Sequence, residues 1–120
     1  MRTVAFAPEY TDLASRYIAA ELRRGVTAAL SDGKQVTVDL SNVLSMSESY
    51  ADEVFGVLVV TLGIQRFVQM ITIKNANEHI LRVIAKALKD RLEQASAGSL
   101  KDTLHTLVAA KNQRSRVAYR

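Results

Sequence analysis

Apolar and polar residues alternate in three short stretches of the chain, and this period of two predicts three strands. Residues 2–7 alternate loosely and end at Pro8, which is typical of a first, edge strand. Residues 67–73 alternate in the same way. Residues 35–40 predict a buried strand, because three apolar side chains share one face: Val36, Val38 and Leu40.

Three longer stretches place apolar residues three and four positions apart, which predicts helices over residues 13–30, about 49–62, and 76 or 77 to 94. Gly25 lowers the stability of the first helix by about 1 kcal/mol relative to alanine, so a break can occur there. The second helix is apolar nearly all round, which indicates burial on more than one side or a partner surface. The third is expected to bury Ile80, Leu81, Val83, Ile84, Ala87, Leu88 and Leu92. A shorter terminal helix follows, with Leu100, Leu104, Leu107 and Val108 as its stripe.

Residues that favour helix N-termini stand where each of the three longer helices is expected to begin. A cap satisfies backbone N–H groups that the first helical turn leaves without partners. The candidate caps are Thr11 or Asp12 for the first helix, Ser49 with Asp52 (or, alternatively, Ser47) for the second, and Asn75 with Glu78 for the third.

The order β, α, β, α, β, α, α predicts an α/β fold with a mainly parallel or mixed sheet and helices packed on it. Three strands are few, so a fourth strand in an irregular stretch, or completion of the sheet in a homodimer, stays open. Residues 1–110 are expected to form a single domain, because a chain of 120 residues with 48% hydrophobic residues suits one core.

The polar turn over residues 44–50 lies between a buried strand and an apolar helix. Open α/β sheets usually place their functional groups at such junctions. We expect Leu44 to remain packed, together with Val43 and Met46. We expect Tyr50 to be about half exposed, in a contact role or a packing role. The turn is therefore the first candidate for function.

The net charge of +4 comes from the last ten residues, which contain Lys111, Arg114, Arg116 and Arg120 and no acid. The rest of the chain holds 12 basic and 12 acidic side chains. Residues 111–120 are therefore predicted to be a basic, flexible tail. The alternative is an arm that docks on nucleic acid or on an acidic partner, which would make the protein a nucleic-acid-associated accessory protein. Four charges are few for that role.

Several classes of site lack support in the sequence. Cysteine is absent, which excludes disulfides and thiolate zinc sites. No apolar run reaches the length of a membrane span, and residues 1–10 lack the apolar core of a secretory signal, so we expect a cytoplasmic protein. No catalytic triad, phosphate loop or metalloprotease motif is present, and His79 and His105 lie far apart on predicted helices. We expect no enzyme and no cofactor.

Asp39 interrupts the apolar strand 35–40. We expect its carboxylate to point outward and to accept a hydrogen bond from a nearby backbone N–H. The alternative is an acidic cluster with Glu48, Asp52 and Glu53 that could hold a divalent cation.

The stretch VDLSNV at residues 38–43, followed by a serine-bearing turn and an apolar helix, resembles the STAS domain. This is the fold of anti-sigma-factor antagonists and of the cytoplasmic part of sulfate transporters. In that family a strand with the pattern Leu-Asp-Leu-Ser-Gly-Val leads to Asp-Ser-Ser-Gly at a helix N-terminus, and a partner kinase phosphorylates the second serine. Without gaps, Ser49 falls on that phosphoacceptor position, whereas Ser47, Glu48 and Tyr50 differ from the motif. The resemblance covers about residues 13–93, and the wording SYADEVFG is closer still to bacterial STAS-like domains of unknown function.

The resemblance implies a regulatory protein-interaction module whose partner is a histidine-kinase-like ATPase or an anti-sigma-type kinase. The partner would bind the turn and helix over residues 47–58. Phosphorylation of Ser49 would add about −2 charge and break that contact. Nearby acids oppose a phosphate there, whereas the helix N-terminus favours it. The implied contact residues are Ser47, Glu48, Ser49, Tyr50, Asp52 and Glu53. A small enzyme or ligand-binding domain at the sheet's C-terminal edge stays open as a third reading, without a catalytic set.

Overall fold

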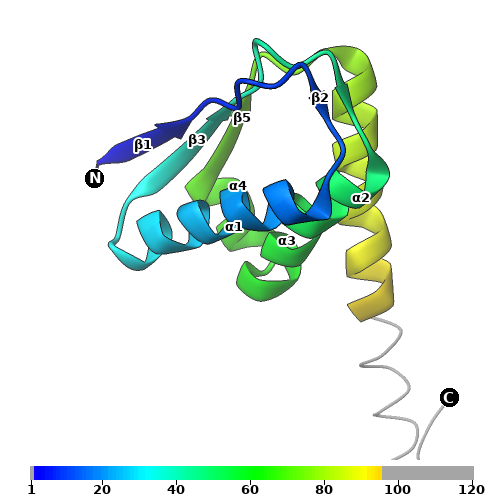
Figure 1. The fold of residues 1–120 in the computed structure, drawn as a ribbon. Coiled ribbons are helices and arrows are strands. Elements are labelled where there is room, and N and C mark those ends of the chain that lie inside the picture. The colour runs from blue at the N-terminus through cyan, green and yellow to red at the C-terminus, as the bar shows by residue number, and fades with distance from the viewer. Residues whose placement is uncertain (1, 96–120) are drawn as a thin grey trace, which may run out of the picture.

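The computed structural model of the chain describes residues 2–95. Short strands and helices follow one another along these residues, as Figure 1 shows, and the last described element is a helix over residues 78–95. The strands are β1 (Thr3–Phe6), β2 (Asp12–Leu13), β3 (Gln35–Asp39), β4 (Ser45–Met46) and β5 (Ile71–Lys74). The other helices are α1 (Arg16–Ser31), α2 (Glu48–Ala51), η1 (Asp52–Gly56), α3 (Val57–Leu62) and α4 (Ile64–Met70).

The main sheet has the order β1-β3-β5, and both of its pairings are parallel. Val36 of β3 pairs with Val4 on one side and with Ile71 on the other, which sets the register of the buried face. α1, α3 and α4 lie on one side of the sheet (Figure 1). The predicted α/β fold with a parallel sheet is therefore confirmed, and β1 is the edge strand that the sequence predicted.

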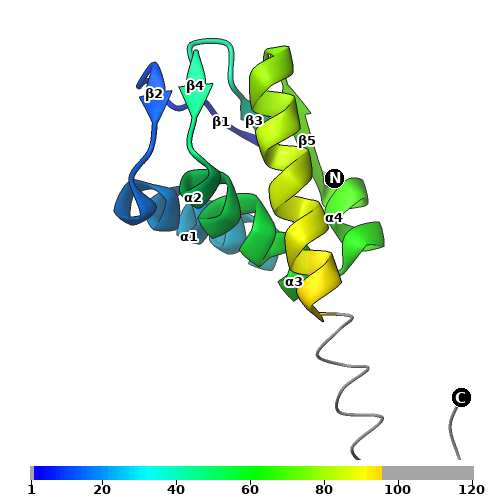
Figure 2. The same ribbon diagram turned by 90° about the vertical axis from the view of Figure 1, so that its right-hand side faces the viewer.

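A second, two-stranded ladder joins β2 to β4, and Figure 2 shows these strands side by side. The carbonyl of Thr11 accepts hydrogen bonds from the backbone N–H groups of Leu44 (2.7 Å) and Ser45 (3.1 Å). Because residues 12–13 are a strand, neither Thr11 nor Asp12 caps α1, and that prediction was wrong. The cap is Ser15, whose hydroxyl accepts from two backbone N–H groups of the first turn.

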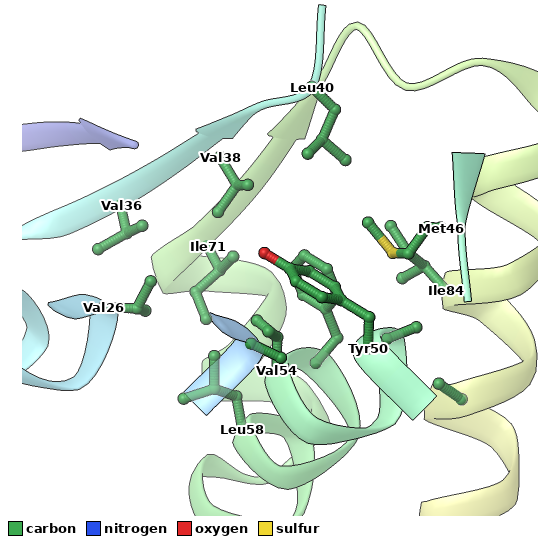
Figure 3. Packing of buried hydrophobic residues seen from close by; sticks show 14 of the residues in the cluster. Val26, Val36, Val38, Leu40, Met46, Tyr50, Val54, Leu58, Ile71 and Ile84 are labelled. Atoms are coloured by element: carbon green, nitrogen blue, oxygen red, sulfur yellow. The ribbon is translucent and has the colours of Figure 1, made fainter. Parts of the chain in front are cut away.

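The core lies between the sheet and the helices, and Figure 3 shows part of it. Val36, Val38 and Leu40 are buried on one face of β3 and its extension, as predicted. α1 runs through Gly25 without the suggested break. A Cβ at Gly25 would lie 3.0 Å from the Phe6 ring, so this glycine allows α1 to approach β1 closely.

Residues 48–62 form one helical run that contains a π-helical turn at η1. Gly63, with φ of 84°, ends the run, and α4 follows. The strand predicted over residues 67–73 was therefore wrong in its first half, because residues 67–70 belong to α4. Within residues 2–95 no single helix has the length and composition to cross a membrane; the bent pair Glu48–Leu62 and Ile64–Met70 meets that criterion only when taken together.

Two predictions of burial and one of capping were also wrong. Leu44 is 68% exposed and Leu81 is 50% exposed. The final helix is capped by Asn77, whose side-chain oxygen accepts from the backbone N–H of Ile80 at 2.8 Å, and not by Asn75. The predicted helix over residues 100–108, His105, the domain end at residue 110 and the tail 111–120 lie outside the described residues.

Candidate functional site

Ser47 connects the start of the 48–62 helix to the segment that precedes α1. Its hydroxyl accepts from the backbone N–H of Tyr50 at 3.0 Å, which makes it the N-cap of α2. The same hydroxyl donates to the carbonyl oxygen of Ala14 at 3.1 Å. The predicted cap at Ser49 was therefore wrong, and the alternative cap at Ser47 was right. Ser47 therefore has a structural role, since its two hydrogen bonds fix the start of the helix against the segment before α1.

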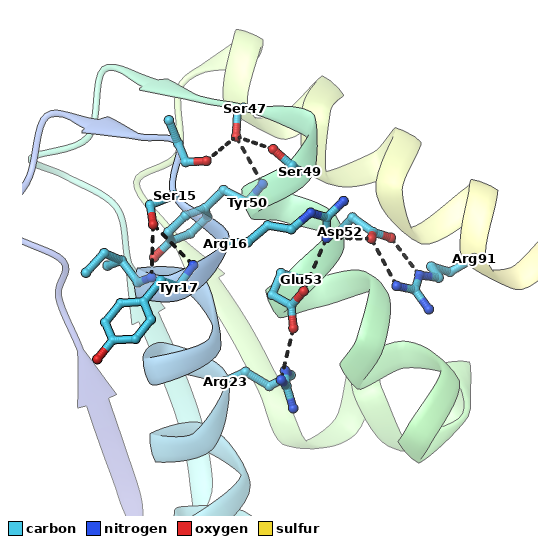
Figure 4. Close-up of polar contacts among 12 residues, drawn as sticks. Ser15, Arg16, Tyr17, Arg23, Ser47, Ser49, Tyr50, Asp52, Glu53 and Arg91 are labelled. Carbon is cyan, nitrogen blue, oxygen red and sulfur yellow. Dashed lines mark hydrogen bonds and ion pairs between the residues drawn. The ribbon is translucent and has the colours of Figure 1, made fainter.

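Ser49 has no comparable task. Its one side-chain hydrogen bond within residues 2–95 joins its hydroxyl oxygen to that of Ser47 at 3.2 Å (Figure 4). The proton of Ser47 already goes to Ala14, so Ser49 is the donor in this contact. Ser49 is half-buried in the first turn of the helix, and its oxygen is available to a reacting group without loss of the cap.

An ion pair between Asp52 and Arg91 joins η1 to the final helix. Arg91 donates from Nε to Oδ1 at 2.6 Å and from Nη2 to Oδ2 at 3.0 Å. The hydrogen bond from Arg91, followed by that from Arg16, lowers the pKa of Asp52, whereas burial opposes the shift. A Cβ at Gly56 would lie 2.8 Å from both the Arg91 side chain and an Asp52 oxygen, so glycine leaves the space in which this pair forms.

Ion pairs of Glu53 connect η1 to α1. Glu53 accepts from Arg16 at 3.2 Å and from Arg23 at 2.9 Å. Arg16 also donates to Asp52 at 3.2 Å, so one network of two acids and three arginines joins three helices (Figure 4). Within the described chain, the Nε of Arg23 is the one fully buried side-chain polar atom without a hydrogen-bond partner. The network fixes the position of α2 and η1 relative to α1.

Lys86 of the final helix faces the first turn of α2. Its ammonium lies 2.8 Å from Asp90 and 3.3 Å from Glu48. The hydrogen bond to Asp90, and then that to Glu48, raise the pKa of Lys86. All three side chains are well exposed, so these pairs add little stability in water. They matter as the charges that stand beside Ser49.

These side chains enclose a groove of about 800 Å³ between the first turn of α1, α2 and the final helix. Its wall carries three cations and three carboxylates, so the groove is electrically balanced although it is strongly polar. The charged and hydroxyl-bearing residues are Arg16, Glu48, Ser49, Asp52, Lys86, Asp90 and Arg91. A change of one charge alters this balance.

The predicted contact residues are not all at this surface. Glu48, Ser49 and Asp52 line the groove, Glu53 is held by Arg16 and Arg23 beside it, and Ser47 is the cap. Tyr50 is 1% exposed, so the prediction of a half-exposed side chain was wrong. Its ring points from α2 into the core (Figure 3). Glu48 and Ser49 of the same turn line the groove.

Asp39 lies at the sheet, apart from these acids. Its carboxylate accepts from the backbone N–H of Ser41 and from the side-chain amide of Asn75, both at 3.0 Å. The bond from Asn75, followed by that from Ser41, lowers its pKa. The predicted backbone hydrogen bond is therefore present. Among residues 2–95, no three His, Asp or Glu side chains are grouped so that they could hold a metal ion. The alternative cluster of Asp39, Glu48, Asp52 and Glu53 is therefore not formed.

Sequence reasoning missed the basic half of the site. Arg16, Lys86 and Arg91 come from helices far apart in the sequence and meet only in the fold. Gly56 gave the one local signal, because a glycine in an apolar helix often marks a close approach. The interaction roles assigned to the turn residues stay predictions.

The family model described as a STAS-like domain of unknown function matches residues 19–81. The matched segment runs from α1 to the start of the final helix, which covers more than half of the chain and includes the turn with Ser47 and Ser49. None of the curated proteins and none of the solved structures matches the chain.

Proposed function

Since the chain belongs to the family of STAS-like domains of unknown function, we propose that it is a non-enzymatic regulatory module that binds a protein partner through the groove beside Ser49. The predicted turn-helix 47–58 supplies one wall of that surface, and α1 and the final helix supply the others. By family resemblance, the partner is a histidine-kinase-like ATPase of the anti-sigma type. Phosphorylation of Ser49 switches the contact off.

The main support for the proposal is that the two serines have different roles. Ser47 holds the helix start through Tyr50 and Ala14, whereas Ser49 contributes a single hydroxyl contact and lines the groove. A side chain with a single hydroxyl contact, in the first turn of a helix, suits a reversible modification. The free N–H groups of that turn favour an added phosphate.

The ion pairs reduce the repulsion that the nearby acids would exert on a phosphate at Ser49. Asp52 and Glu53 are held by Arg16, Arg23 and Arg91, so they do not act as free negative charges. Phosphorylation would add about −2 to a balanced groove. A partner that fits the balanced surface would then meet net negative charge, which weakens binding through repulsion and desolvation.

Affinity capture from native cells tests this proposal. The bait is the full chain as wild type, Ser49→Ala or Ser49→Asp, and quantitative mass spectrometry compares the captured proteins. Ser31→Asp is the matched control, because Ser31 is an exposed serine at the far end of α1. We expect one ATPase to be captured by the wild type, Ser49→Ala and Ser31→Asp, and to be lost with Ser49→Asp.

Two results would contradict the proposal. Equal capture by Ser49→Asp and by the wild type would remove Ser49 as the switch. Equal loss with Ser31→Asp would show that any added charge is enough and that the groove has no special part. Circular dichroism of each bait establishes that the variants are folded.

A further inference from the structure

A second cavity, of about 330 Å³, lies between the segment that leaves β1 and the first half of α1. Most of its lining side chains are apolar, among them Phe6, Pro8, Ile18 and Leu22. Tyr50 of α2 also lines it. The volume falls at the lower end of the range of small-molecule sites, and an apolar wall with few polar groups is their usual composition. Within the described part of the chain, the cavity shares no lining residue with the groove beside Ser49.

Among the polar residues that line this cavity, Tyr50 is the one that is buried. Tyr50 is 1% exposed, and its hydroxyl makes no hydrogen bond to any residue within 2–95. Desolvation raises its pKa to about 12. Figure 3 shows the hydroxyl oxygen at the end of the ring that points away from α2, into the space between the helices and the sheet. The oxygen keeps a small contact with open space, since Arg23 Nε is the one fully buried polar atom without a partner in residues 2–95. A ligand atom that pairs with this hydroxyl gains a hydrogen bond in mostly apolar surroundings.

The rim of the cavity favours a cation. Glu9 and Glu21 line it, and neither forms an ion pair within the described residues. Tyr10 stands at the same rim and is 63% exposed, so its ring face is open to a ligand. Two carboxylates and an aromatic ring attract an ammonium group through charge and cation–π interaction. Among residues 2–95, no basic side chain lines this cavity.

We propose that this cavity binds a small organic amine whose apolar body carries a hydrogen-bonding group at the end far from the amine. The ammonium lies at the rim with Glu9 and Glu21, the body fills the apolar wall, and the far polar group pairs with the Tyr50 hydroxyl. The ligand would sit one residue from Ser49 along α2, on the opposite side of that turn. Binding in this cavity does not depend on the partner surface beside Ser49.

Four matched probes test the ligand chemistry on the intact chain by NMR titration of ¹⁵N-labelled protein. Tyramine carries both the amine and the far hydroxyl. Phenethylamine lacks the hydroxyl, tyrosol replaces the amine by a neutral alcohol, and 4-hydroxyphenylacetate replaces it by a carboxylate. We expect tyramine to bind most tightly, with saturable shifts at Phe6, Ile18 and Leu22, and 4-hydroxyphenylacetate to bind most weakly.

Variants then test the two polar contacts. Tyr50→Phe should weaken tyramine about fivefold, which corresponds to a hydrogen bond of about 1 kcal/mol, and should leave phenethylamine unchanged. Tyr17→Phe is the control, because Tyr17 is 71% exposed and does not line the cavity. Glu9→Gln with Glu21→Gln should remove the preference for tyramine over tyrosol, whereas Glu78→Gln on the final helix should keep it.

Three results would overturn the proposal. The first is the absence of saturable shifts at the cavity residues with any probe, which would mean that the hydroxyl is only hydrated. The second is equal or tighter binding of 4-hydroxyphenylacetate compared with tyramine. The third is an unchanged tyramine affinity in Tyr50→Phe, provided that its thermal unfolding shows an intact fold.

Discussion

Arg91 holds both carboxylate oxygens of Asp52, with its Nε 2.6 Å from Oδ1 and its Nη2 3.0 Å from Oδ2. This two-point contact fixes the final helix against the π-helical turn at residues 52–56, and π-helical turns often occur at functional sites. The pair therefore determines one wall of the groove beside Ser49. It also neutralises an acid that would otherwise oppose a phosphate there.

Gly56→Ala tests the steric basis of this pair. The new methyl group would meet Arg91 and Asp52, each at 2.8 Å, so the two side chains must separate. We expect the pKa of Asp52 to rise toward its ordinary value of 3.8 in a carboxyl ¹³C NMR titration. The free energy of unfolding should change by less than about 1 kcal/mol, because alanine's better helix propensity offsets the weakened ion pair.

Arg91→Ala should raise the Asp52 pKa in the same way, whereas Lys89→Ala, on the exposed side of the same helix, should not. An Asp52 pKa that is unchanged in Gly56→Ala would mean that the glycine is not required for the contact.

The acid dependence of stability should follow from the same carboxylate. The pKa of Asp52 is lowered in the folded protein, so below 3.8 the unfolded chain binds a proton that the folded chain does not. The contribution of the pair is complete above that pH and is lost as the pH falls below it. Asp52→Asn should make urea unfolding less dependent on pH in this acid range, with a lower stability at pH 7. Parallel curves for the variant and the wild type would contradict the assignment.

The two serines should differ in their effect on stability. Ser47→Ala removes the N-cap and the bond to Ala14, and we expect a loss of about 1–2 kcal/mol in the free energy of unfolding. Ser49→Ala removes one hydroxyl contact at a half-buried site and should cost less than about 0.5 kcal/mol. Chemical denaturation of both variants gives the comparison. A larger loss for Ser49→Ala than for Ser47→Ala would mean that Ser49, and not Ser47, supplies the cap.

Ionisation of Tyr50 should account for part of the loss of folding stability at alkaline pH. Burial raises its pKa to about 12, so above its ordinary value of 10.0 the unfolded phenol loses its proton before the folded one does. Stability should fall as the pH rises between these values, with a slope of at most about 1.4 kcal/mol per pH unit from this group. Tyr50→Phe should show a shallower decline. An identical decline would mean that the hydroxyl ionises as freely in the folded protein as in the unfolded chain.

Strong local patterns made much of the fold predictable. The alternation around Val36 and Val38 gave the central strand, and the helical spacing gave α1 and the final helix. Residues 67–70 were misassigned because a short apolar stretch fits the period of a helix as well as that of a strand. The turn at Gly63, with its positive φ, starts α4 at Ile64, and residues 67–70 continue this helix. The ladder of β2 with β4 has two residues in each strand, too few to form a pattern.

The candidate site was predictable only in its acidic half. Glu48, Asp52 and the serines are neighbours in the sequence, and the resemblance drew attention to them. Their partners on α1 and on the final helix lie more than 30 residues away, as with Arg91, and nothing local marks them. The burial of Tyr50 follows from which side of the turn meets the core, and that depends on the packing of the whole domain.

The most direct measurement is the dissociation constant between the captured ATPase and the full chain carrying phosphoserine at position 49, installed during synthesis of the protein. The references are the unmodified chain and a chain with phosphoserine at position 31. The account predicts binding at least about tenfold weaker for phosphoserine 49 and unchanged binding for phosphoserine 31. Equal affinity of all three proteins would contradict the claim that Ser49 switches this surface.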